Sequence, residues 1–418
     1  MHDFRYKNGQ LYCEDVRIKD LAEKFGTPVY VYSYNTFTEH FLKLKKAFRE
    51  VNPLICYSVK ANSNLSILKA LVAKGAGLDI VSGGELFRAL KAGCPAEKIV
   101  YASVGKTGKE IEDAIKQGIL FFNVESLPEL ENINRIAKRL NKFTNVALRI
   151  NPDVEPKTHK YITTGKLTDK FGIDFNTASG ILRMADKFFY ARIKGLHIHI
   201  GSQITEGDSF VAAINKVTAF IAMQKAKGLN LEYLNIGGGL GIVYNKETPQ
   251  TAEEFARKVI PLLKKSGLKI IMEPGRFIIG SAAALVVKVL YVKNTPLKKF
   301  VIQDGGMNDL IRPALYEAHH EVWPLVRRSG KKITVDVVGP ICESGDFFAK
   351  ERNLAPVSGG DYMAVMCSGA YGFSMASNYN SRRRPAEILV NRKKAMVIRK
   401  RETYNDLIHN EVIVSKFD

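Results

Sequence analysis

Residues 53–62 read PLICYSVKAN, and this stretch shows how the first part of the chain is built. An apolar, strand-forming run ends in Lys60, and turn-forming residues follow. An amine is costly to desolvate at the end of a buried strand, so the pKa of Lys60 is expected to fall and its amine to become a nucleophile. A surface lysine that merely follows a strand is the alternative, and this segment alone favours it.

The same pattern repeats on both sides of this strand. From about residue 28 to 274, short apolar runs alternate with longer amphipathic stretches such as 35–50, 63–74 and 209–227. Such alternation predicts a parallel sheet with helices outside, and eight or so units in roughly 250 residues is the size of a TIM (β/α)8 barrel. Nine runs compete for eight places, so one belongs elsewhere or caps the barrel. The nine are residues 29–32, 54–59, 78–81, 99–102, 120–124, 146–150, 193–200, 233–236 and 268–273.

The texture of the sequence changes after about residue 276. Short runs rich in valine and isoleucine follow one another, with turn residues between them and few helical patterns. This is typical of a mainly β domain, with which the strand-like run 11–16 can pair. We therefore predict a barrel domain over residues 27–275 and a β domain built from 1–26 and 276–418.

Composition limits the function classes. The 418 residues are 46% apolar and 25% charged, as in ordinary globular proteins, and their number favours two domains. The formal net charge of +20 could attract nucleic acid, an anionic membrane or an anionic substrate. The basic residues are spread along the chain, however, without a recognisable nucleic-acid-binding signature. We interpret most of the excess as solvated surface and predict no nucleic-acid partner.

Cysteine usage and the apolar runs indicate the compartment. Five cysteines at irregular spacing, without a CxxC pair, argue against a disulfide framework and a zinc site. The amino terminus lacks the apolar core of a signal peptide, and no run reaches membrane-spanning length. We expect a soluble cytoplasmic protein without a membrane partner.

Polar motifs follow several predicted strands, and reactive residues of a TIM barrel collect at the carboxyl ends of its strands. In the run 193–200, alternation places His197 and His199 on one face, here the barrel interior. A flat imidazole there can stack on a cofactor ring, with Ser202 available for a phosphate. A core histidine with its hydrogen bonds satisfied is the default alternative. A metal site lacks acidic or cysteine partners at ligand spacing.

Two further motifs end later strands. Gly237, Gly238 and Gly239 follow the run 233–236, and consecutive glycines let backbone N–H groups approach a phosphate closely. The motif is neither a P-loop nor the dinucleotide-binding GxGxxG pattern, and a tight turn is the alternative.

Residues 273–276 read Glu-Pro-Gly-Arg. The carboxylate of Glu273 can pair with a protonated ring nitrogen, Gly275 can offer its N–H to phosphate, and Arg276 can grip a substrate carboxylate. A strand-ending turn with a surface ion pair is the alternative here. A Lys60 amine can form a Schiff base with pyridoxal phosphate, and the four motifs together supply each protein part needed to hold that cofactor.

In this order the motifs resemble those of the fold-type III decarboxylases, which use pyridoxal 5'-phosphate and pair a TIM barrel with a carboxy-terminal β domain. The similarity extends from residues 8–11 and 26–32 to 384–387. It implies that Lys60 is the Schiff-base lysine, that His199 stacks on the ring and that Glu273 partners the ring nitrogen. The other implied cofactor-binding residues are Asp79, Ser202, Gly237, Gly238, Gly239, Gly275, Arg276 and Tyr371.

Three carboxy-terminal segments, residues 306–316, 339–346 and 369–373, resemble those of certain family members. These members convert meso-2,6-diaminopimelate to L-lysine and carbon dioxide, the last step of lysine biosynthesis. The resemblance implies that Arg312 and Tyr316 bind the distal end of the substrate and that Tyr371 lies against cofactor and substrate. It also implies that Cys342 and Glu343 reach the neighbouring subunit's site, where Cys342 donates a proton. A lone cysteine is more often a small buried apolar residue. A homodimer with shared sites is therefore expected.

The charges of the substrate agree with the resemblance. Arg276 and Arg312 can bind the distal carboxylate of diaminopimelate while Glu343 takes its ammonium group. Ornithine and arginine have no distal carboxylate, and an unpaired arginine in a dry pocket would disfavour them. The alternatives are a decarboxylase of ornithine, arginine or carboxynorspermidine, and a non-catalytic homologue that binds pyridoxal phosphate.

Overall fold

The computed structural model describes residues 2–154 and 170–414. The chain forms two compact units, one of Phe37–Gly280 and one of Met1–Thr36 together with Ser281–Asp418. The limits expected from the sequence for the barrel domain were residues 27 and 275.

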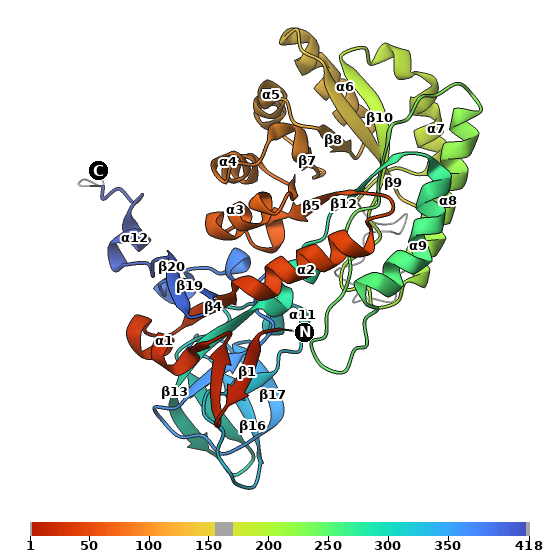
Figure 1. The fold of residues 1–418 in the computed structure, drawn as a ribbon. Coiled ribbons are helices and arrows are strands. Elements are labelled where there is room, and N and C mark those ends of the chain that lie inside the picture. The colour runs from red at the N-terminus through yellow and green to blue at the C-terminus, as the bar shows by residue number, and fades with distance from the viewer. Residues whose placement is uncertain (1, 155–169, 415–418) are drawn as a thin grey trace. The chain divides into compact units, whose positions relative to one another are not determined.

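The first unit is a closed barrel of eight parallel strands, as predicted. Helices surround these strands (Figure 1). The strands are β5 (Leu54–Ser58), β6 (Gly77–Ile80), β7 (Ile99–Tyr101), β8 (Phe121–Val124), β9 (Thr144–Ile150), β10 (Ala191–Ile198), β11 (Tyr233–Asn235) and β12 (Lys269–Met272). The helices are α3 (Leu65–Ala73), α4 (Gly83–Lys91), α5 (Gly108–Gln117), α6 (Leu127–Arg139), α7 (Phe175–Arg183), α8 (Asp208–Lys225), α9 (Ala252–Ser266) and the short α10 (Arg276–Ile279).

Four barrel helices begin with one local signal, a serine or threonine followed three residues later by glutamate. The N-cap side chains accept a hydrogen bond from the backbone N–H of that glutamate, which satisfies a donor that the helix leaves open. The pairs are Ser82 with Glu85, Thr107 with Glu110, Ser126 with Glu129, and Thr251 with Glu254. Ser82, Thr107 and Ser126 come shortly after β6, β7 and β8, so there the signal marks where the chain turns from strand to helix.

The second unit contains a mixed nine-stranded sheet and a small amino-terminal sheet. The main sheet has the order β17-β16-β14-β13-β4-β19-β20, with β18 pairing β13 and β15 pairing β18. Its strands are β4 (Val29–Ser33), β13 (Ala283–Asn294), β14 (Lys299–Gln303), β15 (Val322–Pro324), β16 (Ile333–Val338), β17 (Phe347–Leu354), β18 (Tyr362–Val365), β19 (Ala386–Asn391) and β20 (Lys394–Arg399). The helices of this second unit are α1 (Ile18–Phe25), α11 (Arg312–Tyr316) and α12 (Tyr404–Ile408). Helix α2 (Tyr34–Ala47) starts in this unit and continues into the barrel unit.

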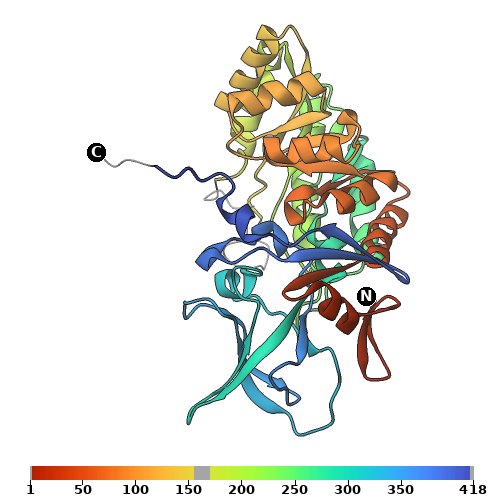
Figure 2. The ribbon, with the colours of Figure 1, turned by 90° about the vertical axis from the view of Figure 1, so that its left-hand side faces the viewer.

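The surplus run 29–32 is β4, which belongs to this sheet and not to the barrel. It lies antiparallel to β13 and parallel to β19, so segments from the two ends of the chain are side by side (Figure 1 and Figure 2). All five β4 residues are buried, and the Tyr32 hydroxyl donates to Glu387 Oε1 of β19 at 2.8 Å. Burial on both faces explains why β4 reads like a barrel strand in sequence.

The run 11–16 covers most of β2 (Gln10–Cys13) and the first residue of β3 (Val16–Arg17), which form a three-stranded sheet with β1 (Phe4–Lys7). The N–H of Leu11 also donates to the carbonyl of Leu325 at 2.8 Å, so the run contacts the β domain as expected. An isolated bridge from Gln10 to Val326 connects the three-stranded sheet with the rest of the unit. In the described part of the chain, no helix has the length and apolar character needed to cross a membrane.

Candidate active site

Lys60 lies in a short 3-10 turn, Val59–Ala61, directly after β5. Its amine donates to Oδ2 of Asp79 in β6 at 3.2 Å. The Lys60 side chain is not desolvated as expected, because 37% of its surface is exposed to solvent. Asp79 is the buried partner. Burial, followed by the nearby charge of Glu273, raises the pKa of Asp79 to about 6, although Lys60 and the Ser58 hydroxyl oppose that rise.

Glu273 follows β12 and is buried inside the barrel. Its Oε1 accepts hydrogen bonds from the side-chain amides of Asn123, at 2.9 Å, and Asn235, at 2.5 Å. Its Oε2 lies 3.2 Å from Nε2 of His197. Burial by itself would raise the pKa of Glu273, but His197, Lys60 and the Asn235 hydrogen bond hold that pKa well below its usual range. Glu273 is therefore an ionised carboxylate that can stabilise a protonated ring nitrogen.

The glycine loop after β11 is tightly packed against neighbouring backbone. A Cβ on Gly238 would lie 2.1 Å from the carbonyl oxygen of Glu273, and Gly237 and Gly239 have φ values of +68° and +110°. Side chains are therefore excluded there, and a bound group can approach the backbone closely. The N–H of Gly238 donates to Nδ1 of His199 at 3.1 Å. Burial, then the charge of Arg149, lowers the pKa of His199 well below its usual value, which keeps the imidazole neutral and able to stack on a ring.

Arg276 begins α10 and is buried, with its guanidinium next to two hydroxyl groups. It donates to Oγ of Ser202 at 3.0 Å and to the hydroxyl of Tyr244 at 2.9 Å. Gly275 packs its backbone against β5 and the lysine turn, since an added Cβ would lie 3.0 Å from Cβ of both Ala61 and Ser58. A buried cation with hydroxyl neighbours fits the phosphate of a cofactor.

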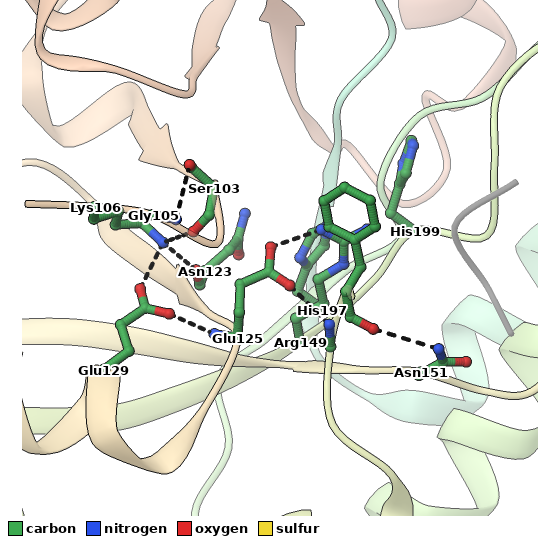
Figure 3. A network of polar contacts seen from close by, with 12 residues as sticks. Ser103, Gly105, Lys106, Asn123, Glu125, Glu129, Arg149, Asn151, His197 and His199 are labelled. Atoms are coloured by element: carbon green, nitrogen blue, oxygen red, sulfur yellow. Dashed lines mark hydrogen bonds and ion pairs between the residues drawn. The ribbon is translucent and has the colours of Figure 1, made fainter. Parts of the chain in front are cut away.

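A network of buried charges lies beside these groups (Figure 3). Lys106 and Glu129 form an ion pair of 2.6 Å, and Arg149 and Glu125 form another of 2.7 Å. Sequence reasoning missed these four residues as well as Asn123, Asn235 and Tyr244. The cap pattern Ser126-x-x-Glu129 is a signal that could have drawn attention to Glu129.

The remaining predicted site residues lie in the second unit. Arg312 is buried at the start of α11, and its Nη1 donates to Nε2 of His320 at 3.2 Å. Nδ1 of His320 in turn donates to the carbonyl of Met366 at 2.7 Å, which fixes the imidazole that orients the arginine. Tyr316, four residues after Arg312, and Tyr371, which has a φ of +56°, are half-buried.

Cys342 and Glu343 are exposed residues of the second unit. The N–H of Cys342 donates to Oδ1 of Asn380 at 2.9 Å. A hydrogen bond to Glu343 raises the pKa of Tyr379. The predicted residues thus form two groups. The barrel unit brings together Lys60, Asp79, His199, Ser202, the glycine loop, Glu273, Gly275 and Arg276, and the second unit contains Arg312, Tyr316, Cys342, Glu343 and Tyr371.

The barrel group fits pyridoxal phosphate on its own geometry, with an accessible amine, a buried carboxylate and a buried guanidinium beside two hydroxyl groups. Among residues 2–154 and 170–414, no three histidine, cysteine, aspartate or glutamate side chains are grouped to hold a metal ion.

Comparison with known proteins identifies the family. Residues 34–280 match the pyridoxal binding domain of the pyridoxal-dependent decarboxylases. Diaminopimelate decarboxylase from Aquifex aeolicus is 48% identical over 404 residues, which cover 96% of each chain. The chain belongs to the diaminopimelate decarboxylase family. Its cofactor is pyridoxal phosphate, and the predictions of the family and of the cofactor are confirmed.

Solved structures of this family agree over nearly the whole length. Diaminopimelate decarboxylase from Helicobacter pylori, complexed with L-lysine, is 41% identical with a TM-score of 0.91, and the match covers 94% of this chain and 99% of that one. The enzyme from M. jannaschii, also in complex with L-lysine, is 39% identical with a TM-score of 0.94 and covers 99% of both chains.

Proposed function

We propose that this chain decarboxylates meso-2,6-diaminopimelate to L-lysine and carbon dioxide. The observation that carries the proposal is the buried Glu273, held by two side-chain amides inside a barrel that also contains the Lys60 amine and the buried guanidinium of Arg276. Its membership of the diaminopimelate decarboxylase family supports this substrate.

Each of the barrel residues has a separate role in the proposed reaction. Bound pyridoxal phosphate supplies a ring that accepts the electron pair left on the α-carbon when carbon dioxide departs. Glu273 would keep the ring nitrogen protonated, and the loop at Gly237–239 with Arg276 would hold the phosphate. The Lys60 amine would hold the cofactor and supply the nucleophile for its aldehyde carbon. Asp79, with a pKa of about 6 next to that amine, is placed to exchange a proton with it.

The second unit supplies the groups for the far end of the substrate. We infer that Arg312 binds the distal carboxylate, with Tyr316 and Tyr371 beside the substrate, and that Glu343 takes the distal ammonium group. Cys342 gives its proton to the α-carbon. Because Cys342 and Glu343 are exposed, they are available to complete the site of a second chain, which supports a homodimer with shared sites. The cytoplasmic location stays a prediction.

The test is product formation by the purified protein with pyridoxal phosphate. We expect lysine and carbon dioxide in equal amounts from meso-diaminopimelate and little turnover of ornithine, arginine or carboxynorspermidine offered in parallel. Preferred turnover of one of those three would retain the chemistry but refute the proposed substrate. A protein that binds the cofactor and turns over none of the four would be the non-catalytic homologue.

A further inference from the structure

Lys106 carries a buried charge that the proposed reaction does not use. Its side chain has 0% exposure, and its ammonium donates to the carbonyl of Ser103 at 2.7 Å, the carbonyl of Asn123 at 2.8 Å and Oε1 of Glu129 at 2.6 Å (Figure 3). An ammonium group has three N–H donors, so these three acceptors use all of them. Burial lowers the pKa of Lys106 and raises the pKa of Glu129.

A contribution to the stability of the fold does not by itself explain why this ion pair is buried. Taking two charges out of water costs several kcal/mol per ion, and apolar replacements of similar volume are often neutral or stabilising. The ion pair instead fixes the position of the backbone around it. Glu129 Oε2 also accepts the backbone N–H of Glu125 at 2.8 Å, so Lys106 and Glu129 together hold both sides of the turn that follows β8.

Asn123 connects this clamp to the site. Its backbone carbonyl accepts from Lys106, and its side-chain amide donates to Oε1 of Glu273 at 2.9 Å. Strand β8 is not a neighbour of β12 in the barrel, so this amide reaches Glu273 across the barrel interior and not along a shared strand edge. A small rotation at the end of β8 would withdraw it.

We propose that Lys106 and Asn123 are positioning residues for Glu273. Lys106 fixes the end of β8, and Asn123 then holds Oε1 of Glu273 together with Asn235, while His197 lies against Oε2, so that the carboxylate keeps one orientation inside the barrel. The inference deepens the proposed function through its cofactor, and it does not depend on which amino acid is the substrate.

The experiment measures the ring nitrogen directly. Holoenzyme loaded with 15N-labelled pyridoxal phosphate, without substrate, is titrated with pH while the 15N chemical shift is recorded. We expect Asn123→Ala to lower the pH at which the ring nitrogen loses its proton by about one unit or more, a tenfold change in proton affinity. The double variant Lys106→Met with Glu129→Gln, which leaves no unpaired buried charge, should shift it in the same direction.

Lys109→Met is the matched control, because Lys109 also forms a 2.6 Å ion pair, with Asp113, but on the surface. It should titrate as the wild type does. Should Asn123→Ala leave the ring-nitrogen titration unchanged while lowering only the melting temperature, the role is structural and the proposal is wrong. If the double variant does not fold, Asn123→Ala decides alone. Because no substrate is present, failure here leaves the proposed reaction untouched, and absence of turnover in the wild type leaves this measurement valid.

Discussion

The buried carboxyl group of Asp79 gives the site a pH dependence. Its folded-state pKa of about 6 is above the usual 3.8, mainly because of burial, so the folded state binds the proton more tightly than the unfolded chain. The stability that this provides is fully present below about pH 4 and is lost as pH rises through 6. Relative to Asp79→Asn, the cofactor-free wild type should lose about 2 to 3 kcal/mol over that range.

Urea unfolding of both proteins across this pH range measures the difference. The matched control is Asp113→Asn, which removes an exposed carboxylate from the surface pair with Lys109 and should follow the wild type. Parallel stability curves for Asp79→Asn and the wild type would contradict the assigned cause.

The N-caps fix where the barrel helices begin. Thr251 and Glu254 form a reciprocal capping box at the exposed start of α9, with contacts of 2.8 and 3.1 Å between the two residues. Thr251→Ala should lower the free energy of unfolding by about 1 kcal/mol and leave cofactor affinity unchanged, since the box touches no site residue. Thr248→Ala, at an exposed position outside the helix, should change neither. A loss of cofactor binding in Thr251→Ala would show that α9 is coupled to the site.

Sequence patterns predict whole strands and contiguous motifs better than isolated site residues. Strand periodicity located all eight barrel strands, and Lys60, the glycine loop and Glu273 were predictable because each lies in a contiguous motif after a strand. Asn123 was not, because a lone asparagine in a strand carries no pattern and acquires its role only when the barrel closes. The strand β4 was ambiguous for a related reason, since burial on both faces looks alike in either unit.

The proposed homodimer with shared sites makes a quantitative prediction for the whole molecule. In a mixture of equal amounts of Lys60→Ala and Cys342→Ala chains, each mixed dimer has one site with both residues intact. Random pairing then restores roughly a quarter of the wild-type activity, whereas each variant alone stays nearly inactive. Activity per milligram after unfolding and refolding the mixture together is the measurement. Mixtures no more active than the separate variants would place Lys60 and Cys342 of one chain in the same site, or remove Cys342 from the reaction.

The insertion of the barrel between β4 and β13 sets an order of events during translation. A ribosome releases β4 roughly 250 residues before its partner β13 and roughly 350 before β19, whereas the barrel strands lie in one continuous segment. The barrel can therefore fold on the nascent chain while the apolar strand β4 still lacks its partners β13 and β19. A chain that stops before β19 would carry a finished cofactor-binding barrel on an unfinished sheet, and it would depend on chaperones to stay out of aggregates.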